Sequence, residues 1–492
     1  MSVTEPSSIK RFLQRSVTKS QDVAALPRFR IGAGDRGRRL VAGDEMEGAL
    51  SADIVDLAMV GSRAANRMAA RLSGTFPDIK DPDAGATLRS AMIHADAIPE
   101  GAARTTWLFA APKLAKGLIK ARPTDPIQLL DGLTGALAVG LALSGHAAIA
   151  RAATTALTRL AQTGFTNDGT LVSRAPDQLA DMFARLVWAA EALPDPPPPL
   201  IDRISILAAS LRGLRLGDGR LTRIHGSGIG DVAHLDQALA RSGTRHTSRP
   251  KLTMGVARLA AGRAIVLIDC APPPAGRLAT QAHAGTLGFE MSAGRKPILI
   301  HQGPGDMAMR DTAGHTAVSI ARMPSSGFAR KGRTPALLRP PAIVTCERAI
   351  DRVGQWLLAS HDGYVPGFGL THERRLFLAP NGEDLRGEDT LSAQSSRDQA
   401  KLATRLAEGS LTATARFHVH PGIVLERRDE DILLHLPNGH IWSMWHSEPA
   451  RLLPSLYTAH RDGHTRDTMQ IVIDAQISDM SARVNWVFRR IA

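Results

Sequence analysis

Two patterns of hydrophobic and polar positions follow one another along the chain. Before about residue 215, apolar side chains recur at three- and four-residue spacing, which is typical of amphipathic helices. After it, short apolar runs recur between turns rich in Gly, Asn, Asp and Pro, which is typical of antiparallel sheets. The pattern predicts an α+β multidomain protein with a helical N-terminal domain and a C-terminal antiparallel β-sandwich.

The helical pattern predicts an array of antiparallel helix pairs, because its apolar stretches are long and the breaks between them are short. The predicted helices cover residues 46–72, 105–121, 126–143, 146–162, 175–193 and 200–214. The most apolar run, Gly132 to Gly145, is too short and too rich in Gly to span a bilayer, so we expect it to be buried in the domain. Residues 1–45 are polar and basic and predict a flexible tail. The predicted domains are a tail (1–45), a helical domain (46–215) and a sheet domain (216–492).

The predicted strands include a hairpin with a histidine near each far end. The strands cover residues 263–270, 286–294, 296–303, 315–321, 355–363, 372–382, 414–421, 431–439, 440–446, 468–476 and 482–492. The second and third fold about Ala293-Gly294, which brings His301 back towards His283. His315 opens the next strand, so three histidines would converge as metal ligands. Chance is the alternative, because the chain has 17 histidines.

The formal net charge of +13 favours an anionic partner, which could be an acidic polysaccharide, nucleic acid or an anionic membrane. A generally basic proteome would explain the charge equally well. No block of like charges, zinc-finger spacing or RNA-binding aromatic motif supports a nucleic-acid partner, and no Gly-rich phosphate loop supports a nucleotide cofactor. The two cysteines form no disulfide framework, and Cys270, which ends an apolar strand, is expected to be a buried thiol. The N-terminal residues carry no apolar signal segment, which leads us to expect a cytoplasmic protein without a membrane span.

Several ordered motifs resemble the C-terminal domain of heparinase II/III-like proteins. They are HAGTLGFEMSAGRKPILI, HTAVSIA, HERRLFLAPNGEDLRGEDTL and RFHVHPGI, preceded by DGTLVSRAPDQLADMFARL and LGDGRLTRIHGSG. The resemblance covers roughly residues 120 to 492. It implies an (α/α) toroid, whose completeness stays open, packed on a β-sandwich that often holds zinc. It also implies a lyase that cleaves uronic-acid-containing polysaccharides by β-elimination. In that reaction a base takes the C5 proton, an acid protonates the departing O4, and a neutralising group holds the carboxylate.

The family's zinc motif, in which two histidines flank a glycine, aligns with Gln281-Ala282-His283. The resemblance therefore implies that His283 is a zinc ligand and that Gln281 stands where the catalytic histidine is expected. The family's acidic ligand falls at His301, and its last histidine falls at His315. The implied zinc site is thus His283, His301 and His315, with one carboxylate exchanged for an imidazole.

The helical domain departs further from the family. Gln178 stands where the resemblance places the catalytic tyrosine, and a glutamine amide cannot shuttle a proton near neutral pH. Two residues are candidate replacements. His225 could be the base, or it could be a structural hydrogen-bonding residue. Arg174 could neutralise the carboxylate, or it could cap the Asp-Gly turn. Gln178 and Gln281 would then contact substrate.

Arg374 is a further candidate substrate contact. It alternates with charged neighbours in the motif HERRL, which puts His372 and Arg374 on one strand face and Glu373 and Arg375 on the other. Cross-strand ion pairs on a solvated face are the alternative for these side chains.

Two functions follow from these residues. The first is a polysaccharide lyase with a rearranged set of proton-transfer groups, which family resemblance favours. The second is a protein that binds an acidic glycan and has lost catalysis, which Gln178 and Gln281 favour. A structural interaction protein is a third alternative, and a homo-oligomer stays open.

Overall fold

The computed structural model describes residues 28–31, 40–43, 76–93, 102–166, 168–244, 252–329, 334–460 and 463–492. The predicted helix over residues 46–72 and most of the predicted tail lie outside these residues. Within the tail, strand β1 (Arg28–Ile31) pairs with strand β2 (Leu40–Gly43) in an antiparallel hairpin.

Contacts between residues divide the chain into two compact units. The helical unit comprises the described residues within 1–169, 178–209 and 231–247, and the sheet unit comprises those within 170–177, 210–230 and 248–492. Two short segments of the N-terminal half therefore belong to the sheet unit. The predicted domain boundary at residue 215 falls inside one of them.

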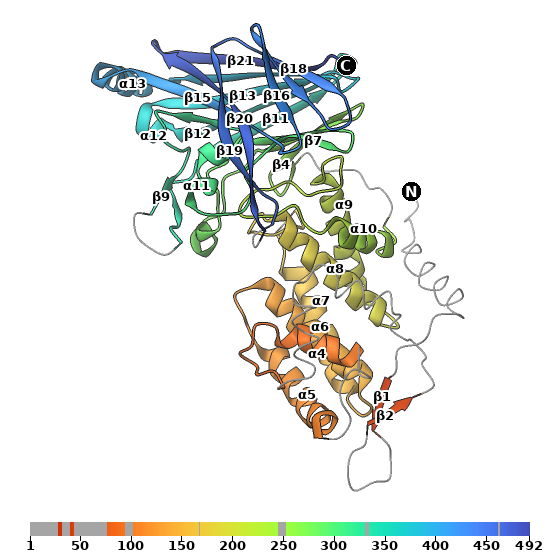
Figure 1. Cartoon of the computed structure of the whole chain (residues 1–492). Coiled ribbons are helices and arrows are strands. Elements are labelled where there is room, and N and C mark those ends of the chain that lie inside the picture. Colours follow the sequence, from red (N-terminus) through yellow and green to blue (C-terminus); the bar gives the residue numbers. More distant parts are fainter. Residues whose placement is uncertain are drawn as a thin grey trace, which may run out of the picture. The chain divides into compact units, whose positions relative to one another are not determined.

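Five of the predicted helices are confirmed (Figure 1). They are α5 (Ala102–Lys120), α6 (Pro126–Ala142), α7 (Ala147–Thr163), α8 (Pro176–Ala192) and α9 (Pro198–Gly213). Two further helices of the helical unit, α4 (Ala84–Ile93) and α10 (Val232–Arg241), were not predicted. In the described part of the chain, no helix has both the length and the apolar character needed to cross a membrane.

Helix α6 forms the centre of the helical unit, as its apolar sequence predicted. Its residues from Leu130 to Gly140 are buried on all sides of the helix. Helix α4 packs on it backbone to backbone, because a Cβ atom added at Gly85 would lie 2.3 Å from the Asp131 carbonyl carbon. The Asp131 carboxylate is buried between Arg89, at 2.8 Å, and Arg185, at 2.7 Å.

The sheet unit contains two large antiparallel sheets (Figure 1). The eight-stranded sheet has the order β11 (Val344–Ile350), β12 (Gln355–Tyr364), β13 (Leu370–Leu378), β14 (Asp384–Ser392), β21 (Ser481–Arg490), β18 (Ile441–His446), β17 (Asp431–His435) and β16 (Val424–Arg428). The nine-stranded sheet has the order β19 (Ala450–Thr458), β20 (Thr465–Ile477), β15 (Leu411–Val419), β7 (Lys296–Ile300), β6 (Phe289–Ala293), β5 (Ala264–Asp269), β4 (Val256–Ala261) and β3 (Leu252–Thr253), with β8 (Val318–Ile320) also paired to β15.

Each predicted strand corresponds to a strand of one of these sheets. The remaining elements are short or peripheral: η2 (Gly276–Thr280), α11 (Met307–Arg310), η3 (Thr312–Gly314), β9 (Gly327–Phe328), β10 (Leu337–Leu338), α12 (Val365–Phe368) and α13 (Ser396–Glu408).

One hydrophobic core joins the two sheets. Phe289 on β6 stacks on Trp486 of β21 with ring centroids 5.4 Å apart and ring planes 9° apart. Phe417 on β15 meets the same tryptophan edge to face, with ring centroids 5.0 Å apart. All three side chains are fully buried. Aromatic rings from both sheets therefore fill the centre of this unit.

Candidate functional site

The sheet unit brings the three predicted metal ligands together. His283 lies in the loop before β6, His301 directly follows β7, and His315 directly follows η3. The imidazole centroids of His283 and His315 are 5.2 Å apart, and those of His301 and His315 are 4.6 Å apart. The antiparallel β6–β7 hairpin and the following return to β8 cause this convergence.

Two glycines make room for the imidazole cluster of His283, His301 and His315. A Cβ atom added at Gly285 would lie 2.8 Å from Nδ1 of His315, and one added at Gly288 would lie 3.0 Å from Cε1 of His301. The backbone of the loop before β6 therefore packs directly on the rings.

The imidazole cluster is neutral. Burial, together with the positive charge that neighbouring histidines and arginines would add, holds the pKa values of all three imidazoles well below the usual range. Nδ1 of His283 and Nε2 of His315 share a hydrogen bond of 3.2 Å. Nδ1 of His315 is buried and has no hydrogen-bond partner among the described residues, so we infer that its proton sits on Nε2 and is donated to His283.

Neutral imidazoles are the form that binds zinc. In the part of the chain that the structure describes, however, no group of three or more His, Cys, Asp or Glu side chains is arranged to hold a metal ion. The three rings lie close together, but the imidazoles of His283 and His315 form a hydrogen bond with each other. Nδ1 of His301 accepts a hydrogen bond from the Thr316 amide at 3.3 Å. In this arrangement the ring nitrogens bond to each other and to the backbone, so the three histidines would hold a metal only if these hydrogen bonds were exchanged for metal bonds.

His225, the candidate base, belongs to a buried network next to the imidazole cluster. Its Nδ1 lies 3.3 Å from the His283 amide, which donates to it, and its Nε2 lies 3.4 Å from Oδ2 of Asp269. His225 is only 1% exposed. Burial, and then the charge of Arg174, lower its pKa, which keeps the imidazole neutral. Both ring nitrogens therefore have partners inside the protein.

Arg174, the candidate carboxylate-binding residue, belongs to the same buried network. Its Nε donates to the Met254 carbonyl at 2.8 Å, and its Nη1 donates to the Pro272 carbonyl at 2.8 Å. Its Nη2 forms a buried ion pair with Asp269. Although burial acts to raise it, Arg174 and His225 hold the pKa of Asp269 below its usual value. Within the sheet unit, Arg174 thus ties the segment 170–177 to Met254, Asp269 and Pro272, and the prediction that it binds a substrate carboxylate is not supported.

The two glutamines differ in their surroundings. Gln281 follows η2 in the sheet unit and its side chain is exposed to solvent. Gln178 lies in the first turn of α8, in the helical unit, and is half-buried. An amide at each position can hydrogen-bond a sugar hydroxyl but cannot transfer a proton.

The prediction that Arg374 contacts substrate is wrong. The side chain is 0% exposed. It forms two hydrogen bonds with Asp389, of 2.6 and 2.9 Å, and Nη1 donates to the Leu287 carbonyl at 2.7 Å. The strand parity was predicted correctly, but the face that carries Arg374 points into the core.

Sequence reasoning missed the acidic residues that organise this region. Asp269 ends β5 and is buried between Arg174 and His225. Glu290 on β6 is 0% exposed, and its carboxylate accepts from Arg223 at 2.8 Å and from the Thr222 hydroxyl at 2.8 Å. A carboxylate inside an apolar strand was the available signal, because such a group requires a buried partner.

Comparisons with known proteins agree with this architecture. The family model of the heparinase II/III-like C-terminal domain matches residues 244–487. A solved heparinase III has a TM-score of 0.64 at 11% identity, covering 89% of this chain and 76% of that one. The heparan sulfate lyase HepC of Pedobacter heparinus has a TM-score of 0.56 at 11% identity, covering 83% and 68%. These likenesses concern the fold.

A curated relative is similar in sequence as well. FtsZ-localized protein C of Caulobacter vibrioides is 31% identical over 341 residues, which are 65% of this chain. The match spans 58% of the relative's length. Residues 244–487 therefore form a heparinase II/III-like C-terminal domain, and the solved heparinases share the fold of the chain.

Proposed function

We propose that this protein binds an acidic polysaccharide and does not cleave it. The observation that carries the proposal is the state of the proton-transfer groups. Gln178 and Gln281 occupy the two positions where the family resemblance expects a tyrosine and a histidine. The remaining candidate base, His225, is 1% exposed with both ring nitrogens engaged. Family resemblance supports an acidic glycan as the ligand, and the net charge of +13 agrees with it.

β-Elimination depends on proton-transfer groups, so glutamines at the positions expected to carry them argue against cleavage. Removing the C5 proton of a uronate requires a base that reaches the sugar, and expelling O4 requires an acid. The carbanion also requires a cation or hydrogen-bond donors at the carboxylate. The Arg174 guanidinium already bonds to Asp269, to His225 and to three backbone carbonyls. The described residues around the imidazole cluster therefore offer neither the base nor the neutralising group in an exposed position.

The runner-up is a polysaccharide lyase with a rearranged set of proton-transfer groups. One experiment separates the two functions. The protein is incubated with heparan sulfate, hyaluronan and alginate, and glycan binding and the absorbance of unsaturated uronate are followed in the same samples. We expect salt-sensitive binding and no absorbance. An absorbance rise that a His225→Ala variant abolishes would establish the lyase instead.

The zinc site also stays a proposal, supported by the proximity of three neutral imidazoles. Metal analysis of the purified protein and of a His283→Ala variant tests it. Stoichiometric zinc that the substitution removes would support a site at His283, His301 and His315. Equal metal content in both proteins would reject it.

We further propose that the helical unit is an incomplete (α/α) toroid and that the two large sheets form a sandwich. The heparinase III folds that match the chain support this architecture. A crystal structure that shows the helical unit closed into a full toroid would contradict the first part.

A second candidate function is localisation with FtsZ. The Caulobacter relative at 31% identity carries that localisation in its name. We propose the same behaviour for this protein, in the cytoplasm. A fluorescent fusion should form a band that coincides with labelled FtsZ, and a diffuse or periplasmic signal would reject it.

A further inference from the structure

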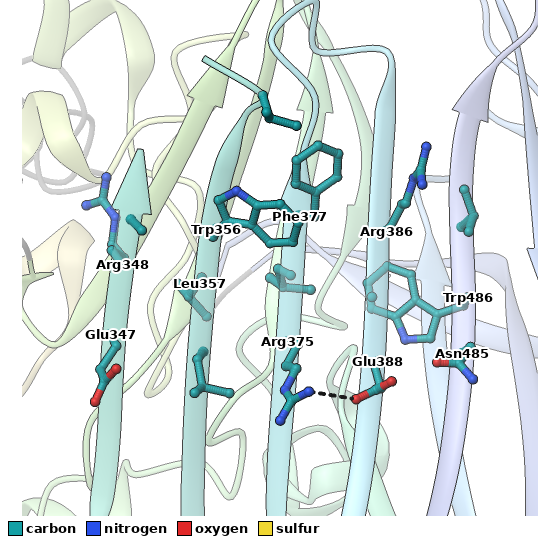
Figure 2. A pocket seen from close by; sticks show the side chains of 16 residues that line it. Glu347, Arg348, Trp356, Leu357, Arg375, Phe377, Arg386, Glu388, Asn485 and Trp486 are labelled. Atoms are coloured by element: carbon teal, nitrogen blue, oxygen red, sulfur yellow. Dashed lines mark ion pairs between the residues drawn. The ribbon is translucent and has the colours of Figure 1, made fainter. Parts of the chain in front are cut away.

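The outward face of the eight-stranded sheet carries a groove of about 790 Å³ (Figure 2). Strands β11, β12, β13, β14 and β21 form it. This volume is typical of ligand-binding pockets. Its exposed side chains, such as Trp356 and Arg375, alternate along their strands with the core residues Leu357 and Leu376, so they lie on the face of the sheet away from the shared core. The groove shares no residue with the imidazole cluster.

An aromatic pair, in which one ring is exposed and the other is half-buried, forms one end of the groove. Trp356 on β12 is the cross-strand partner of Phe377 on β13, and their ring centroids are 4.4 Å apart. Trp356 is 44% exposed. Large aromatic side chains normally bury their surface, so a pair that lies open in a concave site marks a binding surface.

Charged side chains surround this aromatic pair in an ordered way. Arg386 is the next cross-strand neighbour of Phe377, and its guanidinium lies 5.7 Å from the Phe377 ring centroid. Two hydrogen bonds of 3.0 Å to Asp384 orient it, while its side chain stays 56% exposed. Figure 2 shows Arg348 and Arg386 on either side of the aromatic pair.

The other end of the groove is polar. Glu347, Arg375, Glu388 and Asn485 lie there (Figure 2). Arg375 pairs with Glu388 at 3.5 Å, and its side chain is 59% exposed. The lining thus holds three arginines and two glutamates, and both glutamates lie away from the aromatic end.

We propose that this groove binds a carboxylated oligosaccharide. One pyranose ring stacks its apolar C–H face on Trp356, and its carboxylate meets Arg386 or Arg348, whose positive charge complements it. Hydroxyl groups of the neighbouring sugars bond to Arg375, Glu388 and Asn485. The inference rests on the proposed glycan-binding function and assigns that binding to a surface outside the imidazole cluster.

The concave shape favours a glycan over a second copy of the chain. Two grooves placed face to face would leave an unfilled cavity between the copies, which a stable interface avoids. An extended oligosaccharide fills such a groove without that penalty.

The test compares matched variants of the full chain. Trp356→Ala removes the stacking face, and its control is Trp445→Ala, a tryptophan of the same sheet that is also 44% exposed but does not line the groove. Arg386→Gln removes the charge, and its control is Arg451→Gln, whose side chain is also 56% exposed and pairs with Asp474 outside the groove. Binding of heparan sulfate and alginate hexasaccharides is measured by calorimetry, with a neutral cello-oligosaccharide for comparison. Thermal unfolding verifies that each variant folds.

We expect Trp356→Ala to weaken acidic hexasaccharide binding by roughly tenfold or more, and Trp445→Ala to change it by less than about twofold. Arg386→Gln should weaken the binding of the acidic hexasaccharides more than the binding of the neutral oligosaccharide. If the wild type binds acidic glycans and Trp356→Ala binds them equally, the groove assignment is overturned while the proposed function stands. Absence of binding by the wild type would overturn both. If Trp356→Ala changes only the molar mass in solution, the groove is a self-association surface and the assignment is likewise overturned.

Discussion

Asp389 is the residue at which the buried polar contacts of the sheet unit converge. Its carboxylate accepts from Arg374, from His372 at 2.8 Å and from the Trp486 indole at 3.0 Å. Asp389→Ala would leave the Arg374 charge buried without its partner, so we expect a loss of roughly 3–5 kcal/mol of unfolding free energy. Urea unfolding measures it. The matched control is Asp384→Ala on the same strand, whose arginine partners are exposed, and it should cost about 1 kcal/mol or less.

The two cysteines differ in reactivity because of their contact with each other. Cys270 is buried in the core and Cys346 packs against it half-buried. Burial raises the pKa of the Cys270 thiol, whereas a hydrogen bond from Cys270 lowers the pKa of Cys346. We expect iodoacetamide to label Cys346 in the folded protein and Cys270 only after unfolding, as read by peptide mass spectrometry. Cys270→Ala should slow Cys346 labelling near pH 7. Equal labelling of both thiols in the native protein would refute this.

At the element scale, the loop before β6 depends on a glycine that lies against a ring. A Cβ atom at Gly285 would approach the His315 imidazole to 2.8–2.9 Å. We expect Gly285→Ala to displace the ring and lower the free energy of unfolding by roughly 1–3 kcal/mol. Gly367→Ala is the control, because a Cβ atom there meets open space. Similar melting temperatures for the two variants would show that the loop tolerates the change.

The elements themselves were largely predictable from the sequence. Helices α5 to α9 follow the apolar spacing closely, because burial of one face imposes that spacing. Helix α10 was missed since it lies after the change to a strand pattern, although Asp231 caps it as an N-cap should. Strand β14 was missed because charged residues alternate with its buried ones.

The candidate site was less predictable, for a physical reason. Resemblance and hairpin geometry placed His283, His301 and His315 near one another correctly. Arg174 and Asp269 form an ion pair although they are 95 residues apart in the chain, and no local sequence pattern indicates this pairing. Arg374 was misassigned because both faces of its strand carry charges, so only the packing of the two sheets decides which face is buried.

At the scale of the whole molecule, buried neutral histidines should make stability depend on pH. His418 is 0% exposed, donates through Nε2 to the Ala313 carbonyl at 2.9 Å and accepts at Nδ1 from Ser455. Burial lowers its pKa to about 3. The same direction holds for His225, His283, His301, His315, His361 and His372.

The sign of the dependence follows from proton uptake. Between pH 6.5 and about 3 the unfolded chain binds a proton at residue 418 that the folded protein does not, so stability falls as the pH falls. We expect each such histidine to contribute a slope of about 1.4 kcal/mol per pH unit near pH 5. Urea unfolding at pH 7, 6 and 5 measures the slope. The His418→Gln variant should have a slope that is smaller by about 1.4 kcal/mol per pH unit. Stability that is constant or rises on acidification would contradict the neutral assignment.

The heparinase-like fold of this chain carries amides, Gln178 and Gln281, at the positions where the family resemblance places proton-transfer groups, and its candidate base, His225, is buried. The most direct test of binding without cleavage is the fate of the bound glycan. Heparan sulfate is held with a molar excess of protein for many hours, recovered from the complex and analysed for chain length and end groups by mass spectrometry. We expect the bound glycan to keep its length distribution and to carry no unsaturated ends. Shortened chains ending in unsaturated uronate would show that the protein cleaves the glycan it binds.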